Sequence, residues 1–382
     1  MHLPSQRFLV VSASMGAGHD AVAGELARRL ERAGHRADRV DVLELLPAGI
    51  GPGLRVFYRA AVRRAPAVYA GIYRAFFQSG PDPGPDHDHG GGPRPGTAPL
   101  AALAEDRLLA LAGRLRPDAV VPVFHLAAQL TGRLRARGAL TVPSAVVVTD
   151  FAVHRQWLHP GNDLHLCVTE EAAERVRRAL GRPAVATGPL VAGRFLGPAP
   201  GAAGWRRRFE LHAPGRPPVV LSAGAWGAGT RLADTARLLS AAGYLPVALC
   251  GRDERLRHRL SRWPQVVALG WEPDLPGLLG ATRALVDNAA GQTALEALAT
   301  GVPVVGYRPI PGHGREGVRR MAALGLTDHA TDSWELLRLL DALTAASALR
   351  ERRIAAGRRL FATDPADVAA RLADIVSVSE SH

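Results

Sequence analysis

The chain has 382 residues, of which 47% are hydrophobic and 21% are charged. This length and composition are typical of a compact protein with two domains, and they exclude a chain that is disordered throughout. No run of about 18 apolar residues is present, which is the length that a membrane-spanning helix needs, and the N-terminus has no secretory signal pattern. The sequence therefore predicts a cytoplasmic protein.

The formal net charge of +12 favours an anionic partner. No zinc finger, RNP aromatic pattern or dense basic helix is present, so we expect a membrane surface and no nucleic acid. The two cysteines, Cys167 and Cys250, stand in no CxxC or Cys/His spacing. Neither a disulfide framework nor a metal site is expected from them.

Strand and helix signals alternate in both halves of the chain. Short apolar runs predict buried strands at Arg7 to Ser12, Asp118 to Val123, Ser144 to Val148, Leu164 to Val168, Val219 to Ser222, Leu245 to Leu249, Val266 to Leu269, Ala284 to Val286 and Val302 to Val305. Helical patterns cover Ala21 to Leu30, Ala101 to Leu115, Glu170 to Leu180 and Pro365 to Ile375. The alternation predicts an α/β protein with parallel sheets that helices cover on both faces.

Breaks in composition divide the chain into domains. Residues 78–99, rich in Gly, Pro and Asp, predict a disordered loop; the alternative is metal binding by its Asp-His run, which nothing holds in place. Residues 196–217 are predicted to link a first domain, 1–195, to a second, 218–363. A helix within 364–382 is expected to pack back on the first domain. The two Rossmann-like domains should face each other across a cleft, where open α/β sheets bind ligands.

A Gly-rich turn with a histidine follows the first predicted strand. Gly16 and Gly18 lie in the turn, and His19 begins the helix. Glycines let a ligand approach the backbone, and a helix N-terminus should keep the imidazole neutral. A neutral His19 can take the proton from an acceptor hydroxyl. The alternative is a plain connection in which His19 caps the helix.

Polar and aromatic residues also cluster after the strand at Ser144 to Val148. Asp150, His154 and Trp157 follow it within a dozen residues, where such folds place their sites. Asp150 is expected to orient a histidine or bind a sugar hydroxyl, and His154 and Trp157 to form an acceptor pocket. The alternative is an Asp that caps a turn and a Trp that fills the core.

Two segments of the second half predict a nucleotide-sugar site. Ser222 to Thr230 (SAGAWGAGT) follows a strand, and its backbone amides predict a cradle for a diphosphate without a metal ion. Asp287 to Ala297 (DNAAGQTALEA) places Gly291, Gln292 and Thr293 at a helix start and Glu296 about one turn in. That carboxylate can accept hydrogen bonds from both ribose hydroxyls. The alternative is an ordinary helix start with a solvated Glu296.

These motifs resemble a family of GT-B glycosyltransferases that includes monogalactosyldiacylglycerol synthase, the processive diacylglycerol glucosyltransferases and the transferase that forms lipid II. The resemblance rests on MGAGH, RPD, VTDFAVHRQWLHPGND, TGPLV, LSAGAWG, CGRDERL, LGW, TALEA and PIPGHGRE. It implies an inverting, metal-independent transfer of a hexose from a UDP-sugar to a lipid such as diacylglycerol, without a cofactor. His19 would activate the acceptor and Glu296 would bind the ribose.

The resemblance also implies the remaining donor contacts. They are Gly224, Ala225, Trp226 and Gly227 at the phosphates, Trp271 at the nucleobase, and Gly251, Arg252, Gly312 and His313 elsewhere in the donor site. Relatives typically carry PGQE where this chain has Pro311 to Gly314, and Lys-Pro-Gly or Lys-Ala-Gly where it has Asn288 to Ala290. These departures predict an altered donor specificity.

A segment rich in aromatics and Arg, Gly53 to Phe77, lies where lipid-acceptor relatives carry a membrane-docking region. Its predicted lipid contacts, on the inner face of the cell membrane, are Phe57, Arg63, Arg64, Tyr73 and Phe76. The alternative is that its aromatics pack on the first domain. Other functions left open are transfer to a polyprenyl-linked or natural-product acceptor and a non-catalytic nucleotide-sugar sensor.

Overall fold

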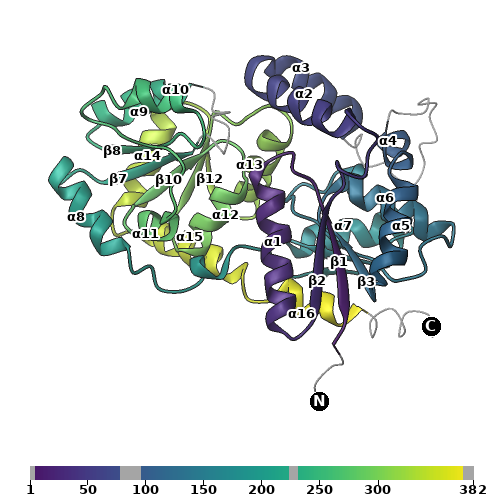
Figure 1. Cartoon of the computed structure of the whole chain (residues 1–382). Coiled ribbons are helices and arrows are strands. Elements are labelled where there is room, and N and C mark those ends of the chain that lie inside the picture. Colours follow the sequence, from purple (N-terminus) through teal and green to yellow (C-terminus); the bar gives the residue numbers. More distant parts are fainter. Residues whose placement is uncertain (1–4, 78–95, 223–230, 373–382) are drawn as a thin grey trace, which may run out of the picture. The chain divides into compact units, whose positions relative to one another are not determined.

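The computed structural model describes residues 5–77, 96–222 and 231–372, without the side chains of Ala17, Arg63, Arg64 and Pro66. The chain divides into two compact units (Figure 1). Unit 1 comprises residues 1–58, 67–190 and 362–382, and unit 2 comprises residues 59–66 and 191–361. The cleft expected between two such domains stays a prediction.

Unit 1 is built on parallel strands, as predicted. They are β1 Arg7–Ser12, β2 Arg36–Asp41, β3 Ala119–Pro122, β4 Ala145–Val147, β5 Leu164–Cys167 and β6 Ala184–Ala186. They pair in the orders β2-β1-β3 and β4-β5-β6, and a parallel bridge from Val120 to Ser144 joins the two sets. The prediction missed β2 (RADRVD), because an edge strand with mostly part-exposed polar side chains carries no apolar run.

Helices lie on both faces of this sheet. The helices of unit 1 are α1 Ala17–Arg32, α2 Ile50–Arg64, α3 Pro66–Phe76, α4 Ala98–Ala102, α5 Glu105–Leu115, α6 His125–Ala136, α7 Glu170–Leu180 and α16 Pro365–Ala370, with a 3-10 turn η1 at Arg155–Trp157. Residues 59–66, at the end of α2 and the start of α3, are counted to unit 2. Alternate residues of β1 point to opposite faces, so Phe8 packs in the cluster that contains α1, and Leu9 packs in the cluster that contains α5 and α6. Both clusters are made of fully buried side chains, which supply most of the unit's stability.

The C-terminal helix α16 packs against α1. Ala366 and Ala369 are buried in the same cluster as Leu26 of α1, and Arg29 lies 2.9 Å from the carboxylate of Asp364. This contact brings the C-terminal segment into unit 1, although unit 2 precedes it in the sequence.

Unit 2 has a single parallel sheet. Its strands are β7 Pro218–Ser222, β8 Leu245–Leu249, β9 Val267–Leu269, β10 Ala284–Asp287, β11 Val304–Tyr307 and β12 Asp328–Ala330. Their order, β12-β11-β10-β7-β8-β9, is that of the Rossmann fold and reverses between β7 and β10. The helices of the unit are α8 Ala202–His212, α9 Leu232–Ala241, α10 Glu254–Leu260, α11 Leu275–Gly280, α12 Gln292–Ala299, α13 His313–Ala323, α14 Ser333–Thr344 and α15 Ala348–Arg359, with a 3-10 turn η2 at Gly193–Phe195.

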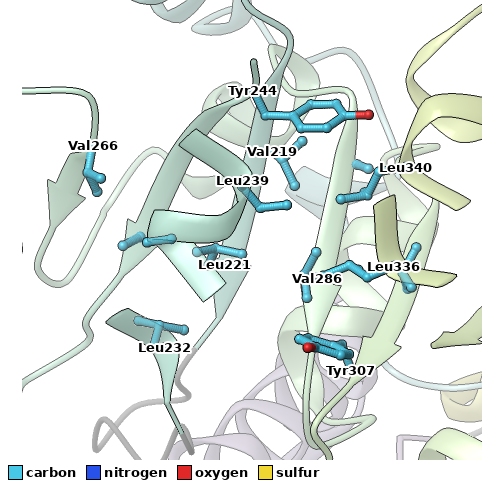
Figure 2. Close-up of a cluster of buried hydrophobic side chains, with 14 of the residues drawn as sticks. Val219, Leu221, Leu232, Leu239, Tyr244, Val266, Val286, Tyr307, Leu336 and Leu340 are labelled. Atoms are coloured by element: carbon cyan, nitrogen blue, oxygen red, sulfur yellow. The ribbon is translucent and has the colours of Figure 1, made fainter. Parts of the chain in front are cut away.

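One buried cluster of unit 2 lies between its sheet and helices α9, α10 and α14 (Figure 2). Leu221 of β7 and Val286 of β10 are buried in one cluster with Leu239 of α9 and Leu336 of α14. Burial of one such side chain contributes about 1.5–3 kcal/mol. The ring of Tyr244 joins the cluster, and its hydroxyl donates a hydrogen bond to Asp341.

The segment predicted as a linker, residues 196–217, contains helix α8. Trp205 and Phe209, four residues apart, are buried on one face of α8, and the Trp205 ring donates a hydrogen bond to Asp274 over 3.1 Å. The linker prediction is therefore wrong for these residues. The sequence analysis missed the helical spacing of Trp205 and Phe209, because Pro and Gly residues lie on either side and Arg residues lie between the two aromatics.

Two glycines let the loop before β5 approach helix α6. A Cβ atom on Gly161 would lie 2.0 Å from the carbonyl oxygen of Gly132, and a Cβ atom on Gly132 would lie 2.5 Å from the His159 ring. Because real side chains cannot approach so closely, both positions require glycine. The contact fixes the segment that carries Asp150, His154 and Trp157 against α6.

We expect Gly161→Ala to lower the free energy of unfolding by about 1–3 kcal/mol, since the added methyl group forces the loop away from α6. The matched control is Gly113→Ala in α5, where a Cβ atom would meet nothing within 4 Å. It should raise the free energy by about 0.5–1 kcal/mol, because Ala is favoured in a helix. Urea unfolding of the three proteins measures both effects, and equal stability of Gly161→Ala and the parent would contradict the close contact.

Candidate functional site

Three histidines from three strand ends lie close together in unit 1. His19 is in the first turn of α1 after β1, His125 begins α6 after β3, and His154 follows β4. The Phe124 ring centroid lies 4.9 Å from that of His19 and 4.1 Å from that of His125. The rings of His125 and His154 are 5.3 Å apart. We call His19, His125, His154 and Asp150 the imidazole group.

The carboxylate of the group, Asp150, is held by two neighbours. It accepts a hydrogen bond of 2.8 Å from the Trp157 ring and lies 3.4 Å from Nε2 of His154. Burial alone would raise the pKa of Asp150, but the hydrogen bonds from His154 and Trp157 outweigh it and hold the pKa below its usual range. Asp150 is therefore ionised, and it contacts His154 as the sequence predicts for an orienting carboxylate.

His19 is a neutral imidazole at neutral pH. Burial lowers its pKa, against the opposite effects of the Asp150 charge and the Val123 backbone. Burial is thus the main cause of the lowered pKa of His19, whereas the sequence analysis attributed its neutral state to the helix N-terminus. Within the described residues its Nδ1 atom has no hydrogen-bond partner. Gly16 is the N-cap of α1, and a Cβ atom there would meet no atom of the described residues within 4 Å.

His125 was not predicted as a site residue. Burial, reinforced by the charges of His154 and His19, lowers its pKa well below the usual value. It stands at the first helical position after a predicted strand, much as His19 stands in the first helical turn after another. His125 thus shares with His19 a position at a helix start after a predicted strand, but it lacks the Gly-rich turn that singled out His19.

The end of helix α3 is hydrogen-bonded to the segment beside the imidazole group. The Phe76 carbonyl accepts hydrogen bonds from Arg155 over 2.9 Å and from Gln156 over 3.0 Å, and the Ala75 carbonyl accepts another from Arg155 over 2.8 Å. The Phe77 ring lies 5.0 Å from the rings of both His125 and His154. These contacts cap α3 and join it to the imidazole group.

The predicted lipid contacts differ in exposure. Phe57 is 54% exposed, and Phe76 is partly buried. Tyr73 is only 3% exposed, because its ring packs between Tyr69 and Phe77, so its prediction as a lipid contact is wrong. The side chains of Arg63 and Arg64 lie outside the described residues. In the described part of the chain, no helix combines the length and apolarity needed to cross a bilayer.

A small pocket lies at the carboxyl edge of the unit 2 sheet, where the strand order reverses. Its polar lining consists of Ser222, Thr235, Asp287, Asn288 and Arg308. The Asp287 carboxylate accepts hydrogen bonds from two backbone amides just after β10, over 2.9 and 2.6 Å, and so shapes the turn before α12. This is the position at which a Rossmann-like sheet binds ligands.

Two predicted donor segments meet beside this pocket. Gly291 is the N-cap of α12, and Gln292 and Thr293 form its first turn. Gly312, with φ of 82°, precedes α13, which His313 begins. The segments are joined by a 2.8 Å hydrogen bond from the Ile310 amide to the Asn288 carbonyl, and a Cβ atom on Gly314 would lie 3.0 Å from the same oxygen.

Glu296 lies about one turn into α12, as predicted. Burial raises its pKa to about 7, although the charge of Arg194 opposes the shift. The Glu296 side chain is partly buried, whereas the alternative of an ordinary helix start expects it to be solvated. Its role toward a ribose stays a prediction.

The remaining predicted donor residues lie at the ends of β8 and β9. The Arg252 guanidinium is 5.3 Å from the centroid of the Trp271 ring, which is 60% exposed. Gly251 has φ of 58°, a left-handed conformation that glycine adopts without strain. The predicted phosphate contacts at Gly224, Ala225, Trp226 and Gly227 lie outside the described residues.

The fold of this chain is the GT-B fold. Two solved structures illustrate the match. One is MurG from Acinetobacter baumannii (TM-score 0.55, 13% identity, 99% of this chain and 100% of that chain covered). The other is Alr3699/HepE from Anabaena in complex with UDP-glucose (TM-score 0.54, 12% identity, 99% and 100% covered). The prediction of a GT-B fold is confirmed.

Sequence comparison finds similarity to one family. Residues 19–183 match the model of the monogalactosyldiacylglycerol (MGDG) synthase family. The chain is also 25% identical over 239 residues to the processive diacylglycerol beta-glucosyltransferase of Bacillus subtilis, with 59% of this chain and 62% of the relative covered. Both matches agree with the family that the sequence motifs predict, although the family model covers fewer than half of the residues of this chain. The chain spans about three fifths of the length of that curated relative.

The raised pKa of Glu296 predicts a pH-dependent stability. A carboxyl group whose pKa is higher in the folded protein than in the unfolded chain makes folding less favourable as the pH rises, here from 4.5 to about 7. Because Glu296→Gln cannot ionise, we expect it to be more stable than the parent at about pH 8 and no more stable at about pH 4.

The matched control is Glu335→Gln. Hydrogen bonds from the backbone and hydroxyl of Thr331 lower the pKa of Glu335, so this variant should lose stability at about pH 8. Urea unfolding at the two pH values measures both effects. A difference between Glu296→Gln and the parent that does not change with pH would show that Glu296 ionises as freely in the folded protein as in the unfolded chain.

Proposed function

We propose that this protein transfers a hexose from a UDP-sugar to a hydroxyl group of a membrane lipid such as diacylglycerol, with inversion at the anomeric carbon and without a metal ion. The observation that carries the proposal is the imidazole group at the strand-order switch of unit 1. A neutral imidazole with a ring nitrogen that makes no hydrogen bond within the described residues is suited to accept a proton.

In the proposed reaction His19 accepts the proton of the acceptor hydroxyl. The acceptor oxygen forms a bond to C1 of the hexose while the bond from C1 to the diphosphate oxygen breaks. The electron pair of that bond leaves with UDP, so one displacement inverts the configuration. The imidazolium formed at His19 lies near the ionised Asp150, whose charge favours it.

The proposed donor is supported by unit 2. Glu296 would accept hydrogen bonds from the ribose hydroxyls, and the exposed Trp271 ring would stack on the uracil. The Anabaena structure with the same fold contains UDP-glucose, which supports a uridine nucleotide here. The proposed lipid acceptor is supported by the Bacillus subtilis relative, whose name specifies diacylglycerol.

A donor and acceptor panel tests this function. Purified protein is incubated with UDP-glucose, UDP-galactose or UDP-GlcNAc and diacylglycerol micelles, and products are read by mass spectrometry. We expect one donor to yield a glycolipid, and His19→Ala to lower turnover by about 10² or more while UDP binding remains, because a general base is lost. UDP binding without any glycolipid would favour a sensor or a different acceptor, and equal turnover of His19→Ala would exclude His19 as the base.

We also propose that helices α2 and α3 contact an anionic membrane surface on the cytoplasmic side. Besides Phe57, the exposed apolar side chains of this pair are Val56 at 66% and Val68 at 55%. Arg59 and Arg74 belong to the same two helices, whereas Arg55 of α2 is paired with Asp41 over 3.2 Å. Apolar side chains that insert between lipids, beside Arg side chains that bind headgroups, are typical of a peripheral membrane contact.

Phe57→Asp tests this contact. We expect it to lower binding to vesicles of phosphatidylcholine and phosphatidylglycerol by about tenfold or more, since an exposed ring that inserts into lipid contributes about 1.5–3 kcal/mol. The control is Leu211→Asp in α8, which replaces another exposed apolar residue, 79% exposed, outside α2 and α3. Vesicle sedimentation measures both variants, and equal loss in the two would show that any added negative charge has this effect.

A further inference from the structure

The carboxylate of Asp41 joins two segments at the carboxyl edge of the unit 1 sheet. Asp41 ends β2 and pairs in register with Ser12, which ends β1. One carboxylate oxygen accepts a 2.9 Å hydrogen bond from the Leu43 amide in the loop after β2. The other accepts hydrogen bonds from the amide of Ser14, over 3.3 Å, and from its hydroxyl. Asp41 therefore connects the loop after β2 to the turn between β1 and α1.

Helix α2 supplies a cation to the same carboxylate. The Nη2 atom of Arg55 lies 3.2 Å from the Asp41 carboxylate and donates a hydrogen bond to the Ser14 hydroxyl. That hydroxyl thus accepts from Arg55 and donates to Asp41. We call Ser14, Asp41 and Arg55 the Arg55 network. Because the Asp41 side chain is only 13% exposed, the guanidinium compensates a charge that has lost most of its hydration.

Apolar contacts hold the start of α2 beside the Arg55 network. Leu54 of α2 and Met15 of the turn both pack against the buried cluster that contains Leu43. A Cβ atom on Gly51 would lie 2.2 Å from the Leu43 carbonyl oxygen, so the backbone of α2 lies directly on the loop after β2. A movement of α2 would therefore displace Arg55 and, through it, the turn between β1 and α1.

The turn that the network holds carries His19, five residues beyond Ser14. Gly16, the N-cap of α1, makes no side-chain hydrogen bond to the helix, and a Cβ atom there would meet no described atom within 4 Å. Neither a side-chain cap nor close packing at Gly16 therefore fixes the backbone before His19, and glycine itself restricts it little. The Arg55 network supplies a restraint on this turn at Ser14.

We propose that Arg55 is a positioning residue, which holds the turn so that the His19 imidazole stays at the acceptor hydroxyl. The inference rests on the proposed function, in which His19 is the general base. A displacement of about 1 Å can lower turnover about 10²-fold, because proton transfer requires hydrogen-bond distance. In this role Arg55 acts through Ser14 and needs no contact with either substrate. The same network makes the position of His19 depend on α2, whose residues Val56 and Phe57 are exposed.

Arg55→Met tests this role, since it removes the guanidinium and retains an unbranched apolar side chain. With diacylglycerol micelles we expect turnover to fall about tenfold or more and the KM for the UDP-sugar to stay within about twofold, because only the proton-accepting geometry changes. A partly exposed ion pair contributes little to stability, so the unfolding temperature should fall by no more than about 4 °C. Arg55→Lys keeps the charge and should recover part of the turnover.

A double-mutant cycle with Ser14→Ala tests whether the two residues act as one network. Arg55→Met should then lower turnover much less in the Ser14→Ala protein than in the parent, and equal factors in the two backgrounds overturn the proposal. The control is Arg114→Met in α5, which removes an exposed arginine elsewhere in unit 1 and should leave turnover unchanged. An equal fall in this control, or parental turnover in Arg55→Met, also overturns the proposal.

Hydrogen exchange tests the same contact without turnover. We expect the backbone amides of residues 13–20 to exchange faster in Arg55→Met than in the parent, while the amides of β7 and β8 in unit 2 exchange as before. If the parent forms no glycolipid, the proposed function fails, and this measurement still decides whether Arg55 holds the turn. Equal exchange of residues 13–20 in the two proteins overturns the inference.

Discussion

The parallel pairing of β1 with β3 is the constraint on which the unit 1 site depends. Because all strands run the same way, their carboxyl ends share one edge, and the connections after β1 and β3 diverge there. His19 and His125 each occupy the first helical turn after these strands. Residues 106 positions apart are thus brought to one place by the register of a single strand pair. In unit 2 the strand order reverses between β7 and β10, and the segments that follow these two strands likewise meet at one edge of the sheet.

Burial gives these groups their protonation states. Removal from water disfavours a charged imidazole, so His19 and His125 are neutral at neutral pH. Asp150 stays ionised because hydrogen bonds from His154 and Trp157 compensate for the lost hydration. Among the residues that the structure describes, no donor raises the stability of the ionised Glu296 carboxylate in this way, and burial raises its pKa to about 7. Burial thus accompanies a lowered pKa at Asp150 and a raised pKa at Glu296. The hydrogen-bond partners of each carboxyl group determine the direction of the shift.

Hydrogen bonds and ring contacts connect the end of α3 to the imidazole group and the residues beside it. Arg155 and Gln156, next to Trp157 in the chain, hold the last carbonyl groups of α3. Phe77, just beyond α3, lies against His125 and His154. A displacement of α3 must therefore disturb these hydrogen bonds and ring contacts. Phe57 and Val68, the exposed residues of these helices, belong to the same unit as the imidazole group.

The sequence alone determined the α/β class, most strands, and the strand-end positions of His19, Asp150 and Glu296, because periodicity and Gly-rich turns are local signals. Only the tertiary structure showed that His125 joins His154, that Tyr73 is buried and that α8 packs on unit 2. It also decided that Arg55 of α2 contacts Ser14 and Asp41. These features depend on contacts between residues far apart in the chain, and the free energy of such contacts is not encoded in any single window of sequence.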